Sequence, residues 1–262
     1  MERKYGYIES PKDLRDYRIN KVYGNIQLPE SFEVKHSKIK DQGNVNSCVA
    51  FSITEILEAA KDEEYSTAWI YGYRPWTYYQ GEGMVVSEAL KTVNKVGYIL
   101  KEDLDANIEM TEARDIVNKN LNTYFERADK RKISSYARLR NADEIKQAIY
   151  TSGKPVLLAI KVGTKGIELD EHNIAYIPNN YSGGHQMVCY GWNETGFLMQ
   201  NSWSEDWGDK GTFILPYEYP IAEAWFIKQN GKVTGKSSIV KPRANLLRSF
   251  IMKFVKFFRM FR

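Results

Sequence analysis

Three residues that lie far apart in the sequence have side chains that can cooperate in nucleophilic catalysis: Cys48, His185 and Asn201. A thiol attacks a carbonyl carbon when a neighbouring base favours its thiolate form, and a third polar side chain usually orients that base. Cys48 begins a run with helical periodicity, and the first turn of a helix stabilises a thiolate. The three residues therefore predict a nucleophile, its base and the group that orients the base.

The residues around these three form four short motifs. They are Gln42-Gly43, Ser47-Cys48-Val49-Ala50-Phe51-Ser52, Gly184-His185 and Asn201-Ser202-Trp203, the last followed by Trp207-Gly208. In these motifs the chain resembles the papain-like cysteine peptidases. Six residues separate Gln42 from Cys48, 137 separate Cys48 from His185, and sixteen separate His185 from Asn201, in agreement with that family. Each residue alone could be a buried or turn residue; their joint spacing carries the prediction.

The resemblance implies a role for each site residue. Cys48 would attack the peptide carbonyl, and His185 would protonate the departing amine. Asn201 would orient the His185 ring, and Trp203 would shield their hydrogen bond from water. The side-chain amide of Gln42 and the backbone N–H of Cys48 would stabilise the oxyanion.

The resemblance also indicates where substrate binds. Carried over by position, the substrate-binding residues are Gly83, Met84, Val85, Ala159, Gly184 and Trp203. Their apolar lining suggests an apolar side chain two residues before the cleaved bond. Two features depart from the family: Val49 replaces a tryptophan after the nucleophile, and Gly184 stands where an acidic residue often precedes the histidine.

Helical patterns precede strand patterns along the chain, which predicts an α+β protein. Residues 48–61 and 106–150 have helix-compatible patterns, with Ser47 and Asn141 as candidate N-caps, whereas residues 156–160, 187–190 and 196–200 resemble buried strands. The resemblance implies two lobes, a helical lobe with Cys48 and an antiparallel sheet or barrel lobe with His185. The active site would be the cleft between them.

Four segments are expected along the chain. Residues 1–28 form an N-terminal extension, residues 29–230 the peptidase domain, residues 231–242 a linker, and residues 243–262 a cationic amphipathic helix. Inhibitory prosegments of the family are much longer than 28 residues, so control of activity must come by another route.

Composition limits the compartment and the ligands. The chain has two cysteines and no apolar stretch after its charged N-terminus, which favours a reducing, cytoplasmic location without a signal peptide. Cys189 is expected to be a buried structural thiol. No Cys, His or carboxylate cluster has the spacing of metal ligands, so we expect no metal and no cofactor.

The net charge of +4 is concentrated in the C-terminal segment. Residues 231–262 contain nine Lys or Arg and no Asp or Glu, which leaves 28 basic and 33 acidic side chains in residues 1–230, a net charge of −5. In residues 243–262, apolar and basic side chains segregate to opposite faces. This pattern favours binding to an anionic membrane surface or to a protein partner, while packing on the peptidase domain is the alternative. No stacking platform accompanies the charges, so nucleic-acid binding is not expected.

The function that we predict is a thiol endopeptidase acting on peptides or proteins. One alternative is a catalytically silent peptide-binding scaffold, but such a scaffold has no need of all four site residues. Another is a transpeptidase or amidase that uses the same residues, which the sequence does not separate from a hydrolase.

Overall fold

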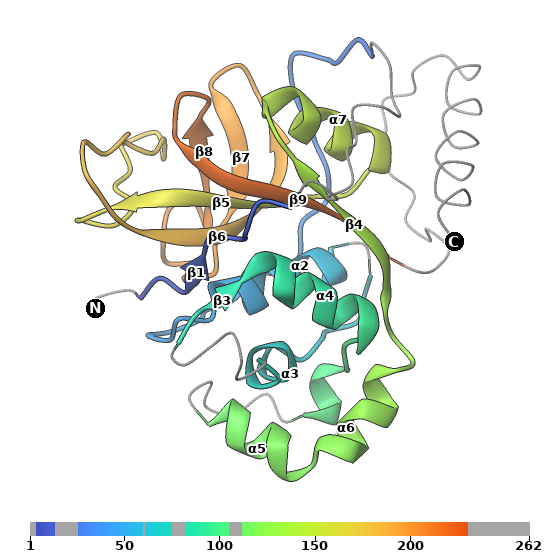
Figure 1. The fold of residues 1–262 in the computed structure, drawn as a ribbon. Coiled ribbons are helices and arrows are strands. Elements are labelled where there is room, and N and C mark those ends of the chain that lie inside the picture. The colour runs from blue at the N-terminus through green and yellow to red at the C-terminus, as the bar shows by residue number, and fades with distance from the viewer. Residues whose placement is uncertain (1–3, 14–25, 60, 75–81, 105–111, 230–262) are drawn as a thin grey trace.

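The computed structural model describes residues 4–13, 26–59, 61–74, 82–104 and 112–229. The predicted linker at 231–242 and the predicted helix at 243–262 lie outside the described residues. Within the described part of the chain, no helix is both long and apolar enough to cross a membrane. Figure 1 shows a group of helices lying beside a twisted sheet.

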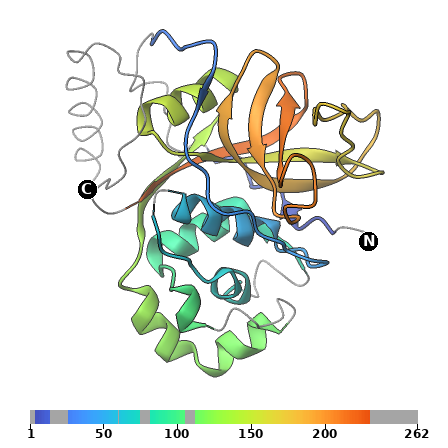
Figure 2. The ribbon, with the colours of Figure 1, turned by 180° about the vertical axis from the view of Figure 1, so that it is seen from behind.

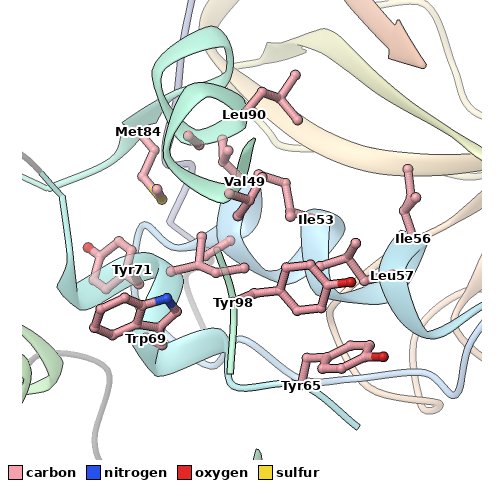
Figure 3. Packing of buried hydrophobic residues seen from close by; sticks show 14 of the residues in the cluster. Val49, Ile53, Ile56, Leu57, Tyr65, Trp69, Tyr71, Met84, Leu90 and Tyr98 are labelled. Atoms are coloured by element: carbon pink, nitrogen blue, oxygen red, sulfur yellow. The ribbon is translucent and has the colours of Figure 1, made fainter. Parts of the chain in front are cut away.

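The helical lobe is built around α2 (Cys48–Glu58), whose eleven residues are all buried. A helix that is buried on every side is usually hydrophobic all round, and the polar exceptions in α2 are Ser52, Thr54, Glu55 and Glu58. Around it lie α3 (Thr67–Gly72), α4 (Val86–Lys95), the 3-10 helix η1 (Lys101–Asp103), α5 (Ala113–Lys119) and α6 (Leu121–Ala128). Figure 3 shows Val49 and Ile53 of α2 packing among the aromatic and aliphatic side chains of this lobe.

The second lobe is an antiparallel sheet with the strand order β4-β9-β5-β6-β7-β8. Its strands are β4 (Ile133–Leu139), β5 (Val156–Gly163), β6 (Tyr181–Trp192), β7 (Gly196–Gln200), β8 (Thr212–Pro216) and β9 (Ile221–Gln229), and β2 (Phe32–Glu33) adds to β6. Helix α7 (Ala142–Ser152) packs on the sheet, and together they enclose a second core that includes Ile149, Leu158 and Phe226. Asn141 caps α7 as predicted, since its side chain accepts a hydrogen bond from the Glu144 amide at 2.9 Å.

The two lobes meet where α2 packs on the sheet. Val188 of β6 and Trp225 of β9 belong to the same apolar cluster as the residues of α2. The Ser52 hydroxyl donates to the Gln186 carbonyl at 3.0 Å, which joins the helix to the strand that carries His185. Seen from behind in Figure 2, the helices of the helical lobe again lie together on one side of the sheet, and α7 lies apart from them.

Two local expectations were wrong. Residues 133–139 form strand β4 in the middle of a stretch predicted to be helical, because they pair with β9, which lies about ninety residues further along the chain. Strand β6 begins at Tyr181, so His185 lies within it rather than before it. The prediction of Ser47 as the N-cap of α2 is confirmed, and its side chain makes no capping hydrogen bond.

A short strand from the N-terminal extension lies between the two lobes. Strand β1 (Tyr7–Ile8) pairs in parallel with β3 (Met84–Val85), a strand that leads directly into α4. Figure 1 shows β1 beside β3 and below β6 of the sheet. The extension therefore does not stay apart from the domain that follows it.

Candidate active site

His185 and Asn201 are fixed to each other by a buried hydrogen bond. The Nε2 atom of His185 lies 2.8 Å from Oδ1 of Asn201, and the same oxygen accepts the Ser202 backbone N–H at 2.8 Å. Because a backbone N–H can only donate, this atom of Asn201 is the amide oxygen, and His185 Nε2 must carry a proton. In the neutral ring the lone pair therefore resides on Nδ1, which has no hydrogen-bond partner among the described residues.

Trp203 covers this pair. Its ring stacks on the His185 ring with centroids 4.7 Å apart and an angle of 27° between the planes. His185, Asn201 and Trp203 are all buried. Their hydrogen bond is therefore shielded from water, which strengthens it and fixes the orientation of the imidazole.

Cys48 is the first residue of α2 and is fully buried against β6. Burial raises the pKa of its thiol to about 11, although backbone hydrogen bonds from Gln186 and Gly6 lower it in part. Burial also lowers the pKa of His185 to about 4, while the hydrogen bond with Asn201 raises it. We expected a low thiol pKa, and in this structure that expectation is wrong: both groups are neutral because the site is sealed from water.

Gln42 is held in place by the loop that contains Asn201. Its backbone N–H donates to the Ser202 carbonyl at 2.9 Å, and its side-chain oxygen accepts from the Ser202 hydroxyl at 2.8 Å. The side-chain nitrogen must then point the other way. It donates to the Val45 carbonyl at 2.9 Å and to the Lys4 carbonyl at 3.3 Å.

The residues that seal the site come from the N-terminal extension. The Tyr5 ring lies edge-on to His185 and to Trp203, with centroid distances of 5.7 and 5.9 Å. The carbonyl of Gly6 accepts the Met84 N–H at 2.7 Å. The Tyr7 ring rests on Gly184 so closely that a Cβ atom there would lie 2.2 Å from it. We call residues 4–10 the N-terminal segment; sequence reasoning gave it no role, because no motif marks it.

The predicted substrate-binding residues lie around this segment. Gly83, Met84 and Val85 precede α4, and the first of them has φ +92°, where a side chain would be strained. Ala159 lies on β5, opposite Gln186 on one side and Glu223 on the other. Tyr7 is thus the register partner of Met84 in the β1–β3 pair, and its ring lies against Gly184.

Glu223 is a site residue that sequence reasoning missed. Its carboxylate is almost fully buried and forms an ion pair with Arg138 at 2.7 Å and a hydrogen bond with the Trp225 indole at 2.9 Å. Burial and the Glu223 charge raise the pKa of the Tyr7 hydroxyl far above its usual range. A lone glutamate in an apolar strand is the signal that could have drawn attention to it.

Other reactive side chains lie elsewhere. Cys189 is buried in β6, and burial raises the pKa of its thiol to about 12. In the part of the chain that the structure describes, no group of three or more His, Cys, Asp or Glu side chains could hold a metal ion.

Comparisons with known proteins define the class. The model of the papain family of cysteine proteases matches residues 28–219, which is most of the chain, so the protein belongs to that family. The predicted two-lobe fold and the predicted cysteine-type peptidase, a hydrolase, are confirmed.

Individual relatives come from a virus, a bacterium and a protozoan. A peptidase C1-like protein of Acanthamoeba polyphaga mimivirus is 26% identical over 85% of this chain and 84% of its own length. Xylellain, a cysteine protease from Xylella fastidiosa, has a similar fold with a TM-score of 0.68 and 20% identity, covering 88% of this chain and 99% of its own. Procathepsin B S9 from Trypanosoma congolense superposes with a TM-score of 0.63 and 12% identity, over 87% of each chain.

Proposed function

We propose that the protein is a thiol endopeptidase in which Cys48 is the nucleophile, His185 the acid and base, and Asn201 the group that orients His185. The observation that carries this proposal is the buried hydrogen bond between His185 and Asn201. It holds the Nε2 proton, so Nδ1 is the ring atom that can exchange a proton with a thiol. Cys48 lies at the start of the helix that packs on the His185 strand.

The reaction follows from these positions. When a peptide enters, the Cys48 thiol transfers its proton to His185 Nδ1, and the thiolate attacks the peptide carbonyl carbon. The carbonyl oxygen becomes an oxyanion, which the Gln42 side-chain amide and the Cys48 backbone N–H stabilise. The C–N bond then breaks as His185 returns its proton to the leaving amine. Water attacks the thioester, with His185 as base, and regenerates the thiol.

Gln42 is suited to this role because its orientation is predetermined. Its side-chain oxygen accepts a hydrogen bond from Ser202, which fixes the orientation of the amide group. The amide N–H groups therefore face the start of α2 and the N-terminal segment. A donor that needs no reorganisation contributes most to the transition state.

Variants test the roles. Cys48→Ala and His185→Ala should each remove essentially all turnover of a fluorogenic peptide. Asn201→Ala and Gln42→Ala should lower kcat and leave residual activity. For Gln42→Ala the loss should be roughly a hundredfold, because it removes an oxyanion donor. Near wild-type kcat in His185→Ala would refute the assignment of the base.

Covalent labelling provides a second test. A related papaya-genus enzyme, Carica candamarcensis CMS1MS2, has been solved in complex with the inhibitor E-64. We expect an epoxysuccinyl inhibitor of this kind to add once, at Cys48, and to abolish activity. Peptide mapping by mass spectrometry separates this outcome from an adduct at Cys189, which would contradict the proposal.

A further inference from the structure

Three basic side chains from separate elements gather where β9 ends beside the start of β4 (Figure 1). Lys61 follows α2, Arg131 lies between α6 and β4, and Lys154 lies between α7 and β5. All three are partly exposed. We call them the basic corner. Within the part of the chain that the structure describes, none of the three forms an ion pair with a carboxylate.

Gln229, the last residue of β9, connects the elements that carry the basic corner. Its side-chain nitrogen donates to the Ile56 carbonyl in α2 at 3.0 Å, and its side-chain oxygen lies 3.5 Å from Lys154 Nζ. In the sheet it is the register partner of Ile133, which follows Arg131 by two residues. The end of β9 is therefore the point at which the three basic segments come together.

Two buried tyrosines connect Lys61 to Arg131. Lys61 Nζ donates to the Tyr65 hydroxyl at 2.8 Å and lies 5.2 Å from the centre of its ring. The Tyr65 ring packs edge-on against Tyr98 with centroids 4.8 Å apart, and the Tyr98 N–H donates to the Arg131 carbonyl at 2.9 Å. These contacts hold the basic corner in place on a rigid part of the domain.

The charges of the basic corner repel one another. Burial lowers the pKa of Lys61, Glu63 raises it, and the Arg131 charge lowers it further. Burial and the Lys61 charge both lower the pKa of Lys154. Like charges that are held close together are stabilised when an anion binds beside them. The basic corner is therefore suited to an anionic partner.

We propose that the basic corner docks the domain on an anionic lipid surface, together with the basic residues that follow β9. The chain passes from Gln229 directly into residues 230–262, and residues 231–262 contain nine Lys or Arg and no Asp or Glu. Two regions of the same charge do not attract each other, but both are attracted to one anionic surface. This inference does not depend on the catalytic roles proposed above.

The sequence after β9 favours lipid over other polyanions. Residues 243–262 combine basic side chains with many apolar ones, among them Leu246, Phe250, Phe254 and Phe258. An anionic bilayer attracts the basic groups and also accepts apolar side chains at the boundary between headgroups and acyl chains. A nucleic acid or a soluble polyanion offers no such partner to the apolar side chains.

The test measures binding of the full-length protein to vesicles of phosphatidylcholine with about 30% phosphatidylserine. The double variant Lys61→Gln/Lys154→Gln should bind roughly 25-fold more weakly than wild type, about fivefold for each basic side chain removed. Glutamine keeps a hydrogen-bond donor at each position, and circular dichroism checks that the variant folds. Lys61→Arg/Lys154→Arg keeps the charges and should bind as wild type does.

The matched control is Lys119→Gln/Lys165→Gln, which removes the same charge from two exposed positions elsewhere. Lys154 precedes β5 and Lys165 follows it, so the eight residues of β5, a length of about 26 Å, separate them. That distance exceeds the screening length of about 8 Å at physiological salt. The control should therefore bind these vesicles within about twofold of wild type.

Several results would overturn the proposal. They are equal binding of wild type to pure phosphatidylcholine vesicles, unchanged binding of the folded Lys61→Gln/Lys154→Gln variant, and an equal loss in the control variant. A single-stranded oligonucleotide is the comparison ligand. If the double variant lost binding to it but kept binding to the vesicles, the basic corner would be a site for nucleic acid and not for lipid. Vesicle binding is measured without substrate, so a failure of the proposed peptidase activity would leave this result unaffected.

Discussion

Glu55 makes the stability of this protein depend on pH in an unusual direction. It lies in the middle of α2 and is 1% exposed, and its carboxylate oxygens have no hydrogen-bond partner among the described residues. Burial raises its pKa to about 8, Lys40 lowers it, and Glu58 raises it further. The folded protein therefore holds a neutral Glu55 at neutral pH, whereas the unfolded chain ionises it near its usual pKa.

The sign follows from proton linkage. Between the ordinary pKa of 4.5 and the folded value of about 8, the folded state binds more protons than the unfolded state. The contribution of Glu55 to stability is fully present below the lower value and is lost as pH rises to the upper one. The slope of the free energy of unfolding against pH approaches about 1.4 kcal/mol per pH unit. The free energy of unfolding should therefore fall by roughly 3 kcal/mol between pH 5 and pH 8.

The free energy of unfolding is measured by urea denaturation at about pH 5, 6, 7 and 8, which covers the titration of Glu55. A Cys48→Ala background prevents self-digestion. Glu55→Met replaces the carboxyl group with an apolar side chain of similar length. The variant should lack the part of the pH dependence of stability that comes from Glu55. Glu126→Met, at an exposed position of α6, is the matched control and should follow the parent. Parallel pH profiles for the parent and Glu55→Met would refute the reasoning.

Two more predictions concern other parts of the chain. Arg138→Met should lower the free energy of unfolding by about 3–5 kcal/mol, because it leaves the buried Glu223 carboxylate without its cation. Thermal unfolding measures this loss, and adding Glu223→Gln to the same variant should recover part of it. No recovery would contradict the assignment of the loss to the unpaired Glu223 charge. Deletion of residues 243–262 should abolish co-sedimentation with anionic vesicles at low salt and leave kcat/KM on a soluble peptide within about threefold. The deleted residues carry six of the nine basic side chains of residues 231–262, together with the apolar side chains expected on the opposite face. Full-length protein that ignores such vesicles would contradict this prediction.

The parts of the site that sequence reasoning located are those fixed by local chemistry and spacing. The structure brings His185, Asn201, Trp203 and Gln42 together through hydrogen bonds and ring contacts between two loops and a strand. Each has a side chain whose chemistry is specific, so a few positions were enough to predict that they meet. Their catalytic roles stay predictions.

The parts that it did not locate depend on contacts between distant segments. Among the described residues, strand β4 pairs only with β9, and the charged sequence around it is typical of a helix when that partner is not known. The N-terminal segment has no motif, and its fit depends on Gly6 meeting the backbone of Asn46. The pKa of Cys48 depends on whether the site is covered, so its direction could not follow from its place at a helix start.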